Sequence, residues 1–500
     1  MEKRLILALT LSFLVLLISS KLMTKPAIAP HPQISPPQEA STIEPLKQAL
    51  SEVPISSEFG YRYGKAQIIF IEPQAAIKEI IFDNYQSYKF PLRYSLLVGN
   101  KSMAFIRQHV AANEVIYSYS DSDKNIIKHF IFSNSNYDIR LEITIQNLSS
   151  SELKVKLPLI LGVLDFASSK SRMSYQDVTV AGKDKTVYPN IRKDNTFNYL
   201  KFIALRDRYF CAIIEPLGES YSGFINKISP NESEIGIVSS ELQIAPGTEL
   251  KQKFHIYLGP QDLKTINAIN PDWQAIIHFG KLDIIAQILL KLLDFFYRLV
   301  HNWGWAIIIL SLAIYVLLYP LTLKQMKSMK EMQLIQPQAE ELKKLYKDNT
   351  QRLNKEIMEL YRKHKVNPLG GCLPLILQIP VFFALYQVLS RSIVLKGAEF
   401  FWIKDLSEPD RLFQFPVELP FLGQYFNLLP ILMAIGMFVQ QKTSMAKMSG
   451  SGAEQQKLMI IIFPIMFGVL FYNMPAGLVL YWFINSSLTL GYQLIVARTK

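Results

Sequence analysis

The chain has 500 residues, of which 50% are hydrophobic and 19% are charged, and its formal net charge is +12. Because an average soluble domain is roughly 25% charged, this composition disfavours an ordinary soluble protein and favours a membrane protein. The two cysteines, Cys211 and Cys372, are expected on opposite sides of the membrane, so neither an internal disulfide nor a cysteine metal site is predicted.

The N-terminal segment, residues 1–22, predicts a transmembrane anchor. Two basic side chains precede an apolar run from Leu5 to Ile18, which also fits a cleaved signal peptide with a small-residue site at Ala27–Ala29. Two lysines lie between the run and that site, and Pro30 follows it directly. Both features favour an uncleaved anchor.

Residues 23–57 are rich in proline, glutamine and serine and predict an extended tether without a core of its own. From 58 to 272 the pattern changes to strands. Ile139–Ile145 alternates strictly between apolar and polar side chains, as in a strand with one buried face. Roughly 215 residues are enough for one all-β sandwich with its own core. Since it follows the first span, this domain is expected in the periplasm.

Residues 273–301 are predicted to form an amphipathic helix. Apolar residues recur at helical spacing from Leu282 to Leu299, and polar side chains such as Lys291 and Asp294 occupy the opposite side. A helix of this kind directly before a membrane span is expected to lie flat in the outer membrane interface. Packing of this helix against the β-domain is the alternative.

Four later windows contain no Asp, Glu, Lys or Arg: 303–323, 366–390, 419–441 and 458–497. A spanning helix needs roughly 20 apolar residues, so the first three windows fit one helix each. The fourth is about twice a span, and Met474–Gly477, with a proline and a glycine, supplies the break. With the N-terminal anchor, the chain is predicted to be an α-helical polytopic membrane protein with six spans.

Lysine and arginine mark the cytoplasmic ends of membrane spans. The basic residues that flank the predicted spans fall on one side only if both termini are cytoplasmic. The segment 324–367 then lies in the cytoplasm, where it is predicted to form an antiparallel helical hairpin, interrupted at Pro337 and turning at Asp348–Thr350. Its mixed charge disfavours a nucleic-acid-binding patch, although contact with ribosomal RNA stays open.

Three stretches carry a resemblance to a known family. They are Asn302–Thr322, with NWGW and YPLT; Asn367–Tyr386, with NPLGGCLP and QIP; and Pro475–Asn485, with PAGLVLYW. The chain resembles the YidC family of membrane protein insertases, in detail over residues 273–497, and its tether and β-domain match the Gram-negative architecture. The resemblance implies a five-span insertase core over 302–500, which inserts integral membrane proteins into the inner membrane and helps them fold.

The resemblance also implies a groove that is open to the cytoplasm and to lipid and closed toward the periplasm. Polar groups cannot cross hydrocarbon unpaired, so a wet recess lowers the barrier for the hydrophilic segment of a client. One polar stripe on the last span is formed by residues at positions i, i+4, i+8 and i+11, which are Tyr481, Asn485, Thr489 and Tyr492. With polar residues of the second and third spans, the predicted groove lining comprises Ser311, Tyr315, Gln378, Gln387, Tyr481, Asn485 and Thr489. The alternative is that these side chains join helices to one another.

The sequence departs from the family in one respect. The family typically places an arginine in the second span, at the position that aligns here with Tyr315. Arg391 does not replace it, because a rise of ~1.5 Å per residue from Cys372 puts Arg391 near the periplasmic end of the third span. The groove is therefore expected to be polar but neutral.

As partners, the resemblance implies nascent membrane proteins as clients, the lipid bilayer, the Sec translocon, and the ribosome or the signal recognition particle receptor through the cytoplasmic loops. No catalytic residue, cofactor, metal or small-molecule substrate is expected. Two other classes stay open. A secondary transporter would show inverted repeats and intramembrane charges, neither of which is apparent. An anchored periplasmic enzyme would use the β-domain, whose His109, His129 and His255 show no nucleophile motif or metal spacing.

Overall fold

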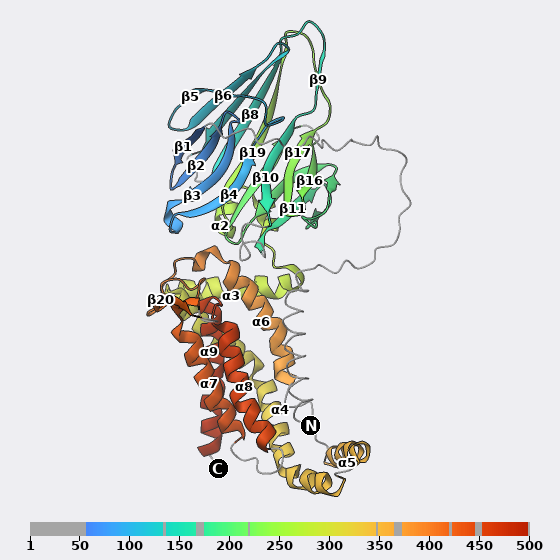
Figure 1. The fold of residues 1–500 in the computed structure, drawn as a ribbon, viewed down its shortest axis with the longest axis vertical. Helices are drawn as coiled ribbons and strands as arrows, with labels where there is room; N and C mark the ends of the chain where they lie inside the picture. The colour runs from blue at the N-terminus through green and yellow to red at the C-terminus, as the bar shows by residue number, and fades with distance from the viewer. Residues whose placement is uncertain are drawn as a thin grey trace.

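The computed structural model describes residues 57–133, 137–166, 175–218, 221–346, 349–364, 373–419, 423–445 and 453–498. The predicted anchor (1–22) and all but the last residue of the predicted tether (23–57) lie outside these ranges. Within them the chain forms a β-rich part, called here the β-domain, and a helical part. The two lie one above the other along the long axis of the molecule (Figure 1).

The β-domain consists of antiparallel sheets. The largest has nine strands, in the order β12 (Thr186–Val187), β11 (Asp177–Gly182), β14 (Leu200–Arg206), β15 (Phe210–Leu217), β19 (Glu249–Pro260), β8 (Asp138–Asn147), β7 (Lys124–Phe132), β6 (Glu114–Ser120) and β5 (Ile106–Val110). A second sheet has the order β1 (Ser57–Tyr63), β2 (Ala66–Glu72), β3 (Ala76–Phe82) and β4 (Tyr88–Ser95). A third has the order β10 (Pro158–Asp165), β17 (Glu232–Ser239), β16 (Tyr221–Ser229) and β13 (Asn195–Phe197), and β9 (Leu153–Val155) pairs with β18 (Leu242–Ile244).

Strand β8 shows why this sequence folds into sheets. Ile139, Leu141, Ile143 and Ile145 are at most 1% exposed, whereas Arg140, between the first two, is exposed. Because successive side chains of a strand point to opposite faces, the alternation buries one face and leaves the other polar. This confirms the strand predicted over Ile139–Ile145.

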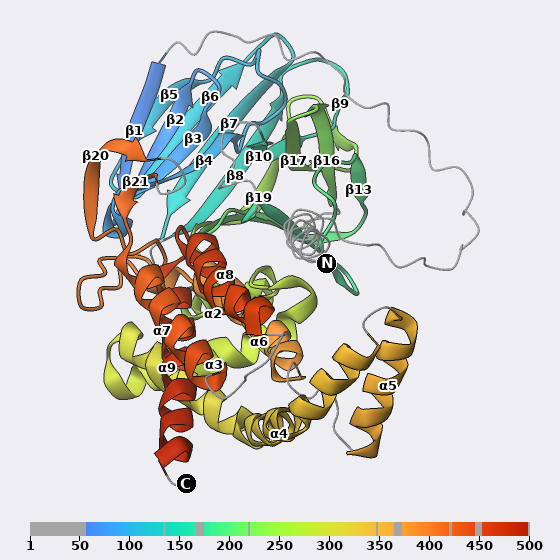
Figure 2. The ribbon, with the colours of Figure 1, turned by 60° about the horizontal axis from the view of Figure 1, so that its bottom comes forward.

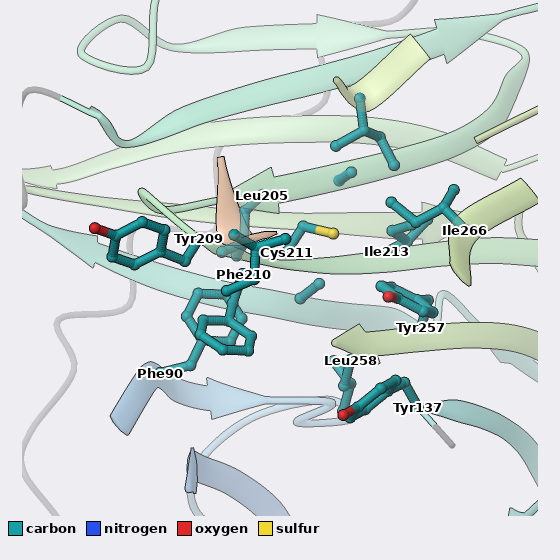
Figure 3. Close-up of a cluster of buried hydrophobic side chains, with 14 of the residues drawn as sticks. Phe90, Tyr137, Leu205, Tyr209, Phe210, Cys211, Ile213, Tyr257, Leu258 and Ile266 are labelled. Carbon is teal, nitrogen blue, oxygen red and sulfur yellow. The ribbon is translucent and has the colours of Figure 1, made fainter. Parts of the chain in front are cut away.

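Aromatic rings join the sheet β1–β4 face to face with the nine-stranded sheet. The ring centroids of Phe70 and Phe130 are 5.3 Å apart, and those of Phe82 and Phe210 are 4.0 Å apart. Figure 3 shows Phe210 directed toward Phe90 in this core, with Tyr209 pointing away from it. Burial of such rings supplies much of the stability of a sheet pair.

The helical part follows the β-domain. Its helices are α4 (Trp303–Leu345), α5 (Thr350–Lys363), α6 (Leu373–Arg391), α7 (Leu428–Met445), α8 (Ala453–Phe471) and α9 (Ala476–Arg498). Between α6 and α7 lie a short 3₁₀ turn, η5 (Ile393–Leu395), and a hairpin of β20 (Phe413–Leu419) and β21 (Gly423–Phe426). α8 ends at Phe471 and α9 begins at Ala476, which confirms the predicted break at Met474–Gly477. Figure 2 shows α5 projecting to one side of the other helices.

Two helical segments among the described residues are long and apolar enough to cross a membrane. They are Trp303–Leu323 of α4 and Ala476–Ile495 of α9. The apolar parts of α7 and α8, Leu428–Thr443 and Ile460–Phe471, are shorter. The predicted total of six spans therefore goes beyond these two segments and stays a prediction.

The predicted interfacial helix is shorter than expected. The segment after β19 forms α2 (Leu263–Ile269), two 3₁₀ turns, η3 (Pro271–Ile276) and η4 (Gly280–Leu282), and then α3 (Asp283–Val300). The start predicted at residue 273 is therefore wrong. Trp273 is fully buried in the β-domain, where its Nε1 donates to Oε2 of Glu215 at 2.9 Å. This hydrogen bond keeps the segment before α3 packed on the β-domain, where it forms turns instead of a continuation of the helix.

Helix α3 itself packs against α4 and α6 rather than against the sheets. Its buried face contains Ala286, Leu289 and Leu293. The outward face is also apolar, and the exposed residues on it are Ile284, Ile288, Leu292, Phe295 and Leu299. Apolar side chains on both faces fit a helix with protein on one side and lipid on the other.

The prediction that Pro337 interrupts the hairpin is wrong, because α4 continues through both Pro320 and Pro337. A proline removes one hydrogen-bond donor and leaves the carbonyl four residues earlier unpaired. Beyond the apolar segment of α4, water can bind that carbonyl, so the helix need not end. The chain turns before α5 instead, where the Asn349 side chain caps the helix by accepting from the Arg352 amide at 3.0 Å.

Candidate functional site

A polar contact joins α6 and α9 inside the helical part. Tyr481 of α9 is fully buried, and its hydroxyl accepts a hydrogen bond from Nε2 of Gln378 on α6. One turn further along α9, Nδ2 of Asn485 donates to the Tyr481 carbonyl at 3.1 Å. Another turn on, the Thr489 hydroxyl donates to the Asn485 carbonyl at 2.9 Å. The predicted stripe on the last span is therefore one continuous face, and Gln378 meets it.

Tyr315 brings α4 to the same face. Its half-buried side chain lies close to Thr489, but its hydroxyl has no hydrogen bond of good geometry within the described ranges. Its ring is 6.5 Å from that of Tyr319, which in turn makes an edge contact at 5.4 Å with Tyr492 of α9. A phenol hydroxyl at this position can donate a hydrogen bond to a polar group of another molecule as well as to a neighbouring helix.

Two residues of the predicted lining are set apart from this face. Ser311 lies one turn before Tyr315, and its hydroxyl donates back to the Ile307 carbonyl of its own helix at 2.7 Å. Unlike Asn485 and Thr489, which make similar bonds, Ser311 is fully buried. Gln387 lies nine residues after Gln378, and about 3.6 residues per turn places it on the opposite side of α6. Its Oε1 is buried and has no partner among the described residues. We call Tyr315, Gln378, Tyr481, Asn485 and Thr489 the polar face.

The polar face carries no charge. Tyr315 is a neutral residue, and α6, α7 and α9 have basic side chains only in their end turns. Arg391 is the last residue of α6 and lies next to the β-domain, with its guanidinium 5.3 Å from the ring of Tyr175. It therefore lies at the outer end of α6, away from the Gln378–Tyr481 contact.

The outer surface of the helices is apolar. A cavity of about 460 Å³ lies between α7 and α8, lined among others by Ile431, Phe438, Pro464 and Ile465. Gly468 lets these helices approach closely, because a Cβ there would lie 3.2 Å from that of Ala434. Small residues at such contacts are typical of helices packed within a membrane. Polar side chains inside and apolar ones outside are the arrangement expected for a protein dissolved in lipid.

A set of charged residues that was not predicted from the sequence lies where the β-domain meets the helices. Arg208, between β14 and β15, pairs with Glu408 at 3.1 Å, and Lys396 pairs with Asp405 at 2.8 Å. Arg208 and Glu408 are 200 positions apart in the chain, so no local pattern reveals that they pair. The one signal was the stretch Trp402–Ser407, which resembles a loop of the YidC family.

Two histidines of the β-domain lie within hydrogen-bond distance of carboxylates. His129 lies 2.7 Å from Glu114, and His255 lies 2.7 Å from Asp138. No group of three or more His, Cys, Asp or Glu suited to a metal occurs in the part of the chain that the structure describes.

A β-domain joined to apolar helices that enclose an uncharged polar face defines a membrane-embedded protein with a large domain outside the bilayer. Comparisons with known proteins specify it further. The model of the 60Kd inner membrane protein family matches residues 295–500, and that of the YidC periplasmic domain matches residues 101–292. The chain belongs to the YidC family of membrane protein insertases.

Relatives support this assignment over the whole chain. The membrane protein insertase YidC of Pelobacter propionicus is 31% identical over 545 residues, which cover 100% of this chain and 99% of the relative. That of Syntrophobacter fumaroxidans is 36% identical over 387 residues, 75% of this chain and 68% of the relative. A crystal structure of an active YidC insertase aligns with 20% identity and a TM-score of 0.42, covering 88% of this chain and 93% of that one. The sequence relatives decide among the three classes left open, in favour of the insertase.

Proposed function

We propose that this insertase receives the hydrophilic segment of a client at the polar face and releases the client's apolar helix along the lipid-facing surface. The observation that carries this proposal is the contact of Gln378 with Tyr481, continued by Asn485 and Thr489 along α9. It places hydrogen-bonding groups in a row within helices whose outer surfaces are apolar.

The energetics favour such a route. An unpaired backbone group in hydrocarbon costs several kcal/mol, so a bare hydrophilic segment does not cross the bilayer at a useful rate. A row of hydroxyl and amide groups, with the water it admits, replaces part of the hydration that the segment loses. The apolar helix of the client gains by moving into lipid, so no nucleotide-driven motor is required.

The lack of charge narrows the range of clients. An arginine would attract acidic segments, whereas the Tyr315 phenol offers a dipole and one donor. Coulomb attraction between unit charges is strong wherever water is scarce. This chain therefore gives little advantage to clients with strongly acidic translocated segments and handles neutral polar segments best.

For the membrane arrangement, we propose six spans with both termini in the cytoplasm. The five helices α4, α6, α7, α8 and α9 then form the insertase core, with residues 1–22 as an additional anchor. The β-domain lies in the periplasm, and α3 lies in the outer interface. A thiol-labelling reagent added from outside should reach a cysteine at the exposed Lys404 but not one at Lys442. The reverse pattern would contradict this topology.

The part of α4 beyond residue 323, together with α5, forms the cytoplasmic hairpin in this arrangement. The two helices contact each other, and Nε2 of His364 lies 3.2 Å from Oε1 of Gln338. Exposed charges on the hairpin suit a docking role. We assign to it the contacts with the ribosome or the signal recognition particle receptor, and to the membrane core any contact with the Sec translocon.

Insertion into liposomes tests the proposed route. The purified chain is reconstituted with a client that has one apolar helix and a neutral polar tail, and protease protection of the tail is measured. Asn485→Leu should reduce insertion several-fold. Ser487→Leu is the matched control, because Ser487 lies on the same helix but is exposed on another side. Equal insertion by both variants would refute the route.

A further inference from the structure

The turn between β14 and β15 points from the β-domain toward the helices. Oδ1 of Asp207 accepts from the backbone amides of Tyr209 and Phe210, at 2.8 Å each, which fixes the shape of the turn. Behind it, the Phe210 ring stacks on Phe82 within the sheet core, with ring centroids 4.0 Å apart. The turn is therefore a rigid projection of a well-packed domain.

Arg208 at the tip of this turn makes three hydrogen bonds to the helical part. Its Nε donates to the carbonyl of Ser390 in the last turn of α6 at 2.7 Å. Its Nη2 donates to the Ser407 carbonyl at 2.6 Å, and its Nη1 to Oε1 of Glu408 at 3.1 Å. The planar fork of a guanidinium can bind several acceptors at fixed angles, which a lysine cannot do. Arg208 thus joins the end of α6 to the loop of residues 392–412, called here the outer loop.

Tyr209 and Tyr175 add to the same junction. The Tyr209 hydroxyl donates to Oγ of Ser407 at 2.9 Å, and the hydroxyls of Tyr175 and Tyr386 lie 3.1 Å apart. Burial by itself would lower the pKa of Arg208, but Tyr209 and Glu408 raise it above its ordinary value on balance. The Arg208 guanidinium therefore stays positively charged across the physiological pH range.

The outer loop also holds the start of α9. The backbone amide of Gly477 donates to the Leu406 carbonyl, and that of Ala476 donates to the Glu408 carbonyl, both at 2.8 Å. These are amides of the first helical turn, which have no partner within the helix. The fit is close, because a Cβ on Gly477 would lie 3.2 Å from the Leu406 oxygen and 3.1 Å from Cδ1 of Ile307 on α4.

The outer loop is equally tight against the start of α4. A Cβ on Gly304 would lie only 2.1 Å from the ring of Phe400, so no larger residue fits there without moving the loop. One loop thus contacts the β-domain-facing ends of α4, α6 and α9. These are the three helices that carry the polar face.

We propose that Arg208 is a positioning residue through which the periplasmic domain holds α6 against α9 and fixes the width of the groove at its periplasmic end. This inference rests on the proposed function of the polar face. Arg208 binds the last turn of α6 directly and the first turn of α9 through Leu406 and Glu408. Farther down, the same two helices meet again at Gln378 and Tyr481. Without the Arg208 contacts, the hydrogen bond between Gln378 and Tyr481 is left as the main polar link between α6 and α9.

Hydrogen exchange followed by mass spectrometry tests this role in the full chain, embedded in lipid nanodiscs. Arg208→Ala should speed exchange about ten-fold in peptides covering 404–410 and 474–482, because several hydrogen bonds to a charged group are lost. Arg208→Lys, which keeps the charge but not the fork, should give a smaller increase. Peptides of β15 and β19 should exchange as in the unsubstituted protein.

Arg62→Ala is the matched control, since Arg62 makes an exposed ion pair with Asp83 in the same domain. It should leave exchange in both helical regions unchanged. If Arg208→Ala fails to accumulate, Arg208→Lys and Glu408→Gln decide the question. Unchanged exchange at 474–482, or an increase spread over the whole β-domain, would overturn the proposal.

Client insertion measured on the same samples separates this inference from the proposed function. Arg208→Ala should lower insertion several-fold, together with its local change in exchange. Asn485→Leu should lower insertion without changing exchange at 404–410. Full insertion by Asn485→Leu would refute the route along the polar face, while the exchange at 474–482 would still decide whether Arg208 holds the two helices.

Discussion

The β-domain and the helical part both bury apolar side chains, but they expose different kinds. In the β-domain, apolar residues such as Ile143 and Phe130 fill the interior, and polar residues face outward. In the helical part, Val316, Leu317 and Ile465 are exposed to 60% or more, whereas Tyr481 is fully buried. The difference follows from the solvent of each part, which is water for the sheets and lipid for most of the helices. A polar residue between the helices therefore suggests a route for the hydrophilic segment of a client. A polar residue inside the sheets suggests a role in holding the β-domain together.

The largest effect on client insertion should come from deleting the hairpin, compared with deleting the β-domain. Deletion of Lys330–Lys363 should reduce client insertion by an order of magnitude, because the hairpin lies next to the proposed entrance of the groove. Deletion of residues 60–260 should cost only several-fold, since the Gln378–Tyr481 contact remains and mainly the Arg208 contacts are lost. Insertion into liposomes measures both. Equal losses for the two deletions would remove the functional distinction between the parts.

The next prediction tests whether the Gln378–Tyr481 pair lines the path of the client or only joins two helices. Tyr481→Phe should destabilise the protein by about 0.5–1.5 kcal/mol, because it leaves the partly buried Gln378 amide without its hydrogen-bond partner. Adding Gln378→Leu should restore much of that stability, since both partners are then apolar. If the pair lines the groove, the double variant stays defective in insertion by several-fold. Thermal unfolding in detergent and insertion in liposomes are compared, and a stable double variant with full insertion would show that the pair merely joins helices.

A third prediction concerns the charge of the groove. Tyr315→Arg should selectively improve insertion of clients with acidic tails, because a half-buried cation attracts carboxylates more than a phenol does. Val316→Arg is the matched control, since Val316 is 62% exposed on the outer side of α4. An arginine facing lipid at mid-span costs about 2.5–3.5 kcal/mol, so Val316→Arg should reduce abundance. Reduced abundance of Tyr315→Arg without any gain would place Tyr315 against lipid or packed protein.

The smallest effect on client insertion is expected for a polar group inside the β-domain, whose role is in the stability of that domain. Lys128 is fully buried, and its Nζ donates to the carbonyls of Ala75 and Leu96. Burial lowers the pKa of Lys128 to about 7. The unfolded chain then binds more protons than the folded one between that value and the ordinary lysine pKa of about 10.4. The stability of the β-domain should therefore rise with pH in this window, by at most about 1.4 kcal/mol for each unit of pKa shift.

Pulse proteolysis of the full chain at pH 7 and pH 9 measures this dependence. Lys128→Met should be less stable than the unsubstituted protein, because it leaves two buried carbonyls unpaired, but its stability should change less between the two pH values. The same pH dependence in Lys128→Met would mean that another group titrates.

Local patterns predicted those features that depend on one element at a time. The alternation of Ile139–Ile145, the break at Met474–Gly477 and the stripe on α9 each follow from the geometry of one strand, turn or helix. The helical repeat also separates Gln387 from Gln378, a nine-residue spacing that the predicted lining overlooked. The family itself was found through motifs that no physical pattern would reveal.

Features that depend on distant contacts were not predicted. Trp273 belongs to the β-domain because of Glu215, so the start of α3 could not be found from helical spacing alone. Pro337 was expected to end a helix that continues through it. Arg208 shows no local sign of its role, because its acceptors lie at Ser390, Ser407 and Glu408.

Photo-cross-linking to a stalled client can show which surface of the helices contacts its hydrophilic segment. A photoreactive residue is placed at Asn485 on the polar face, or at Ile435, which is 55% exposed on the outer side of α7. Position 485 should cross-link to the hydrophilic segment of the client, and position 435 should not. Cross-links to that segment from position 435 alone would contradict the proposed route along the polar face.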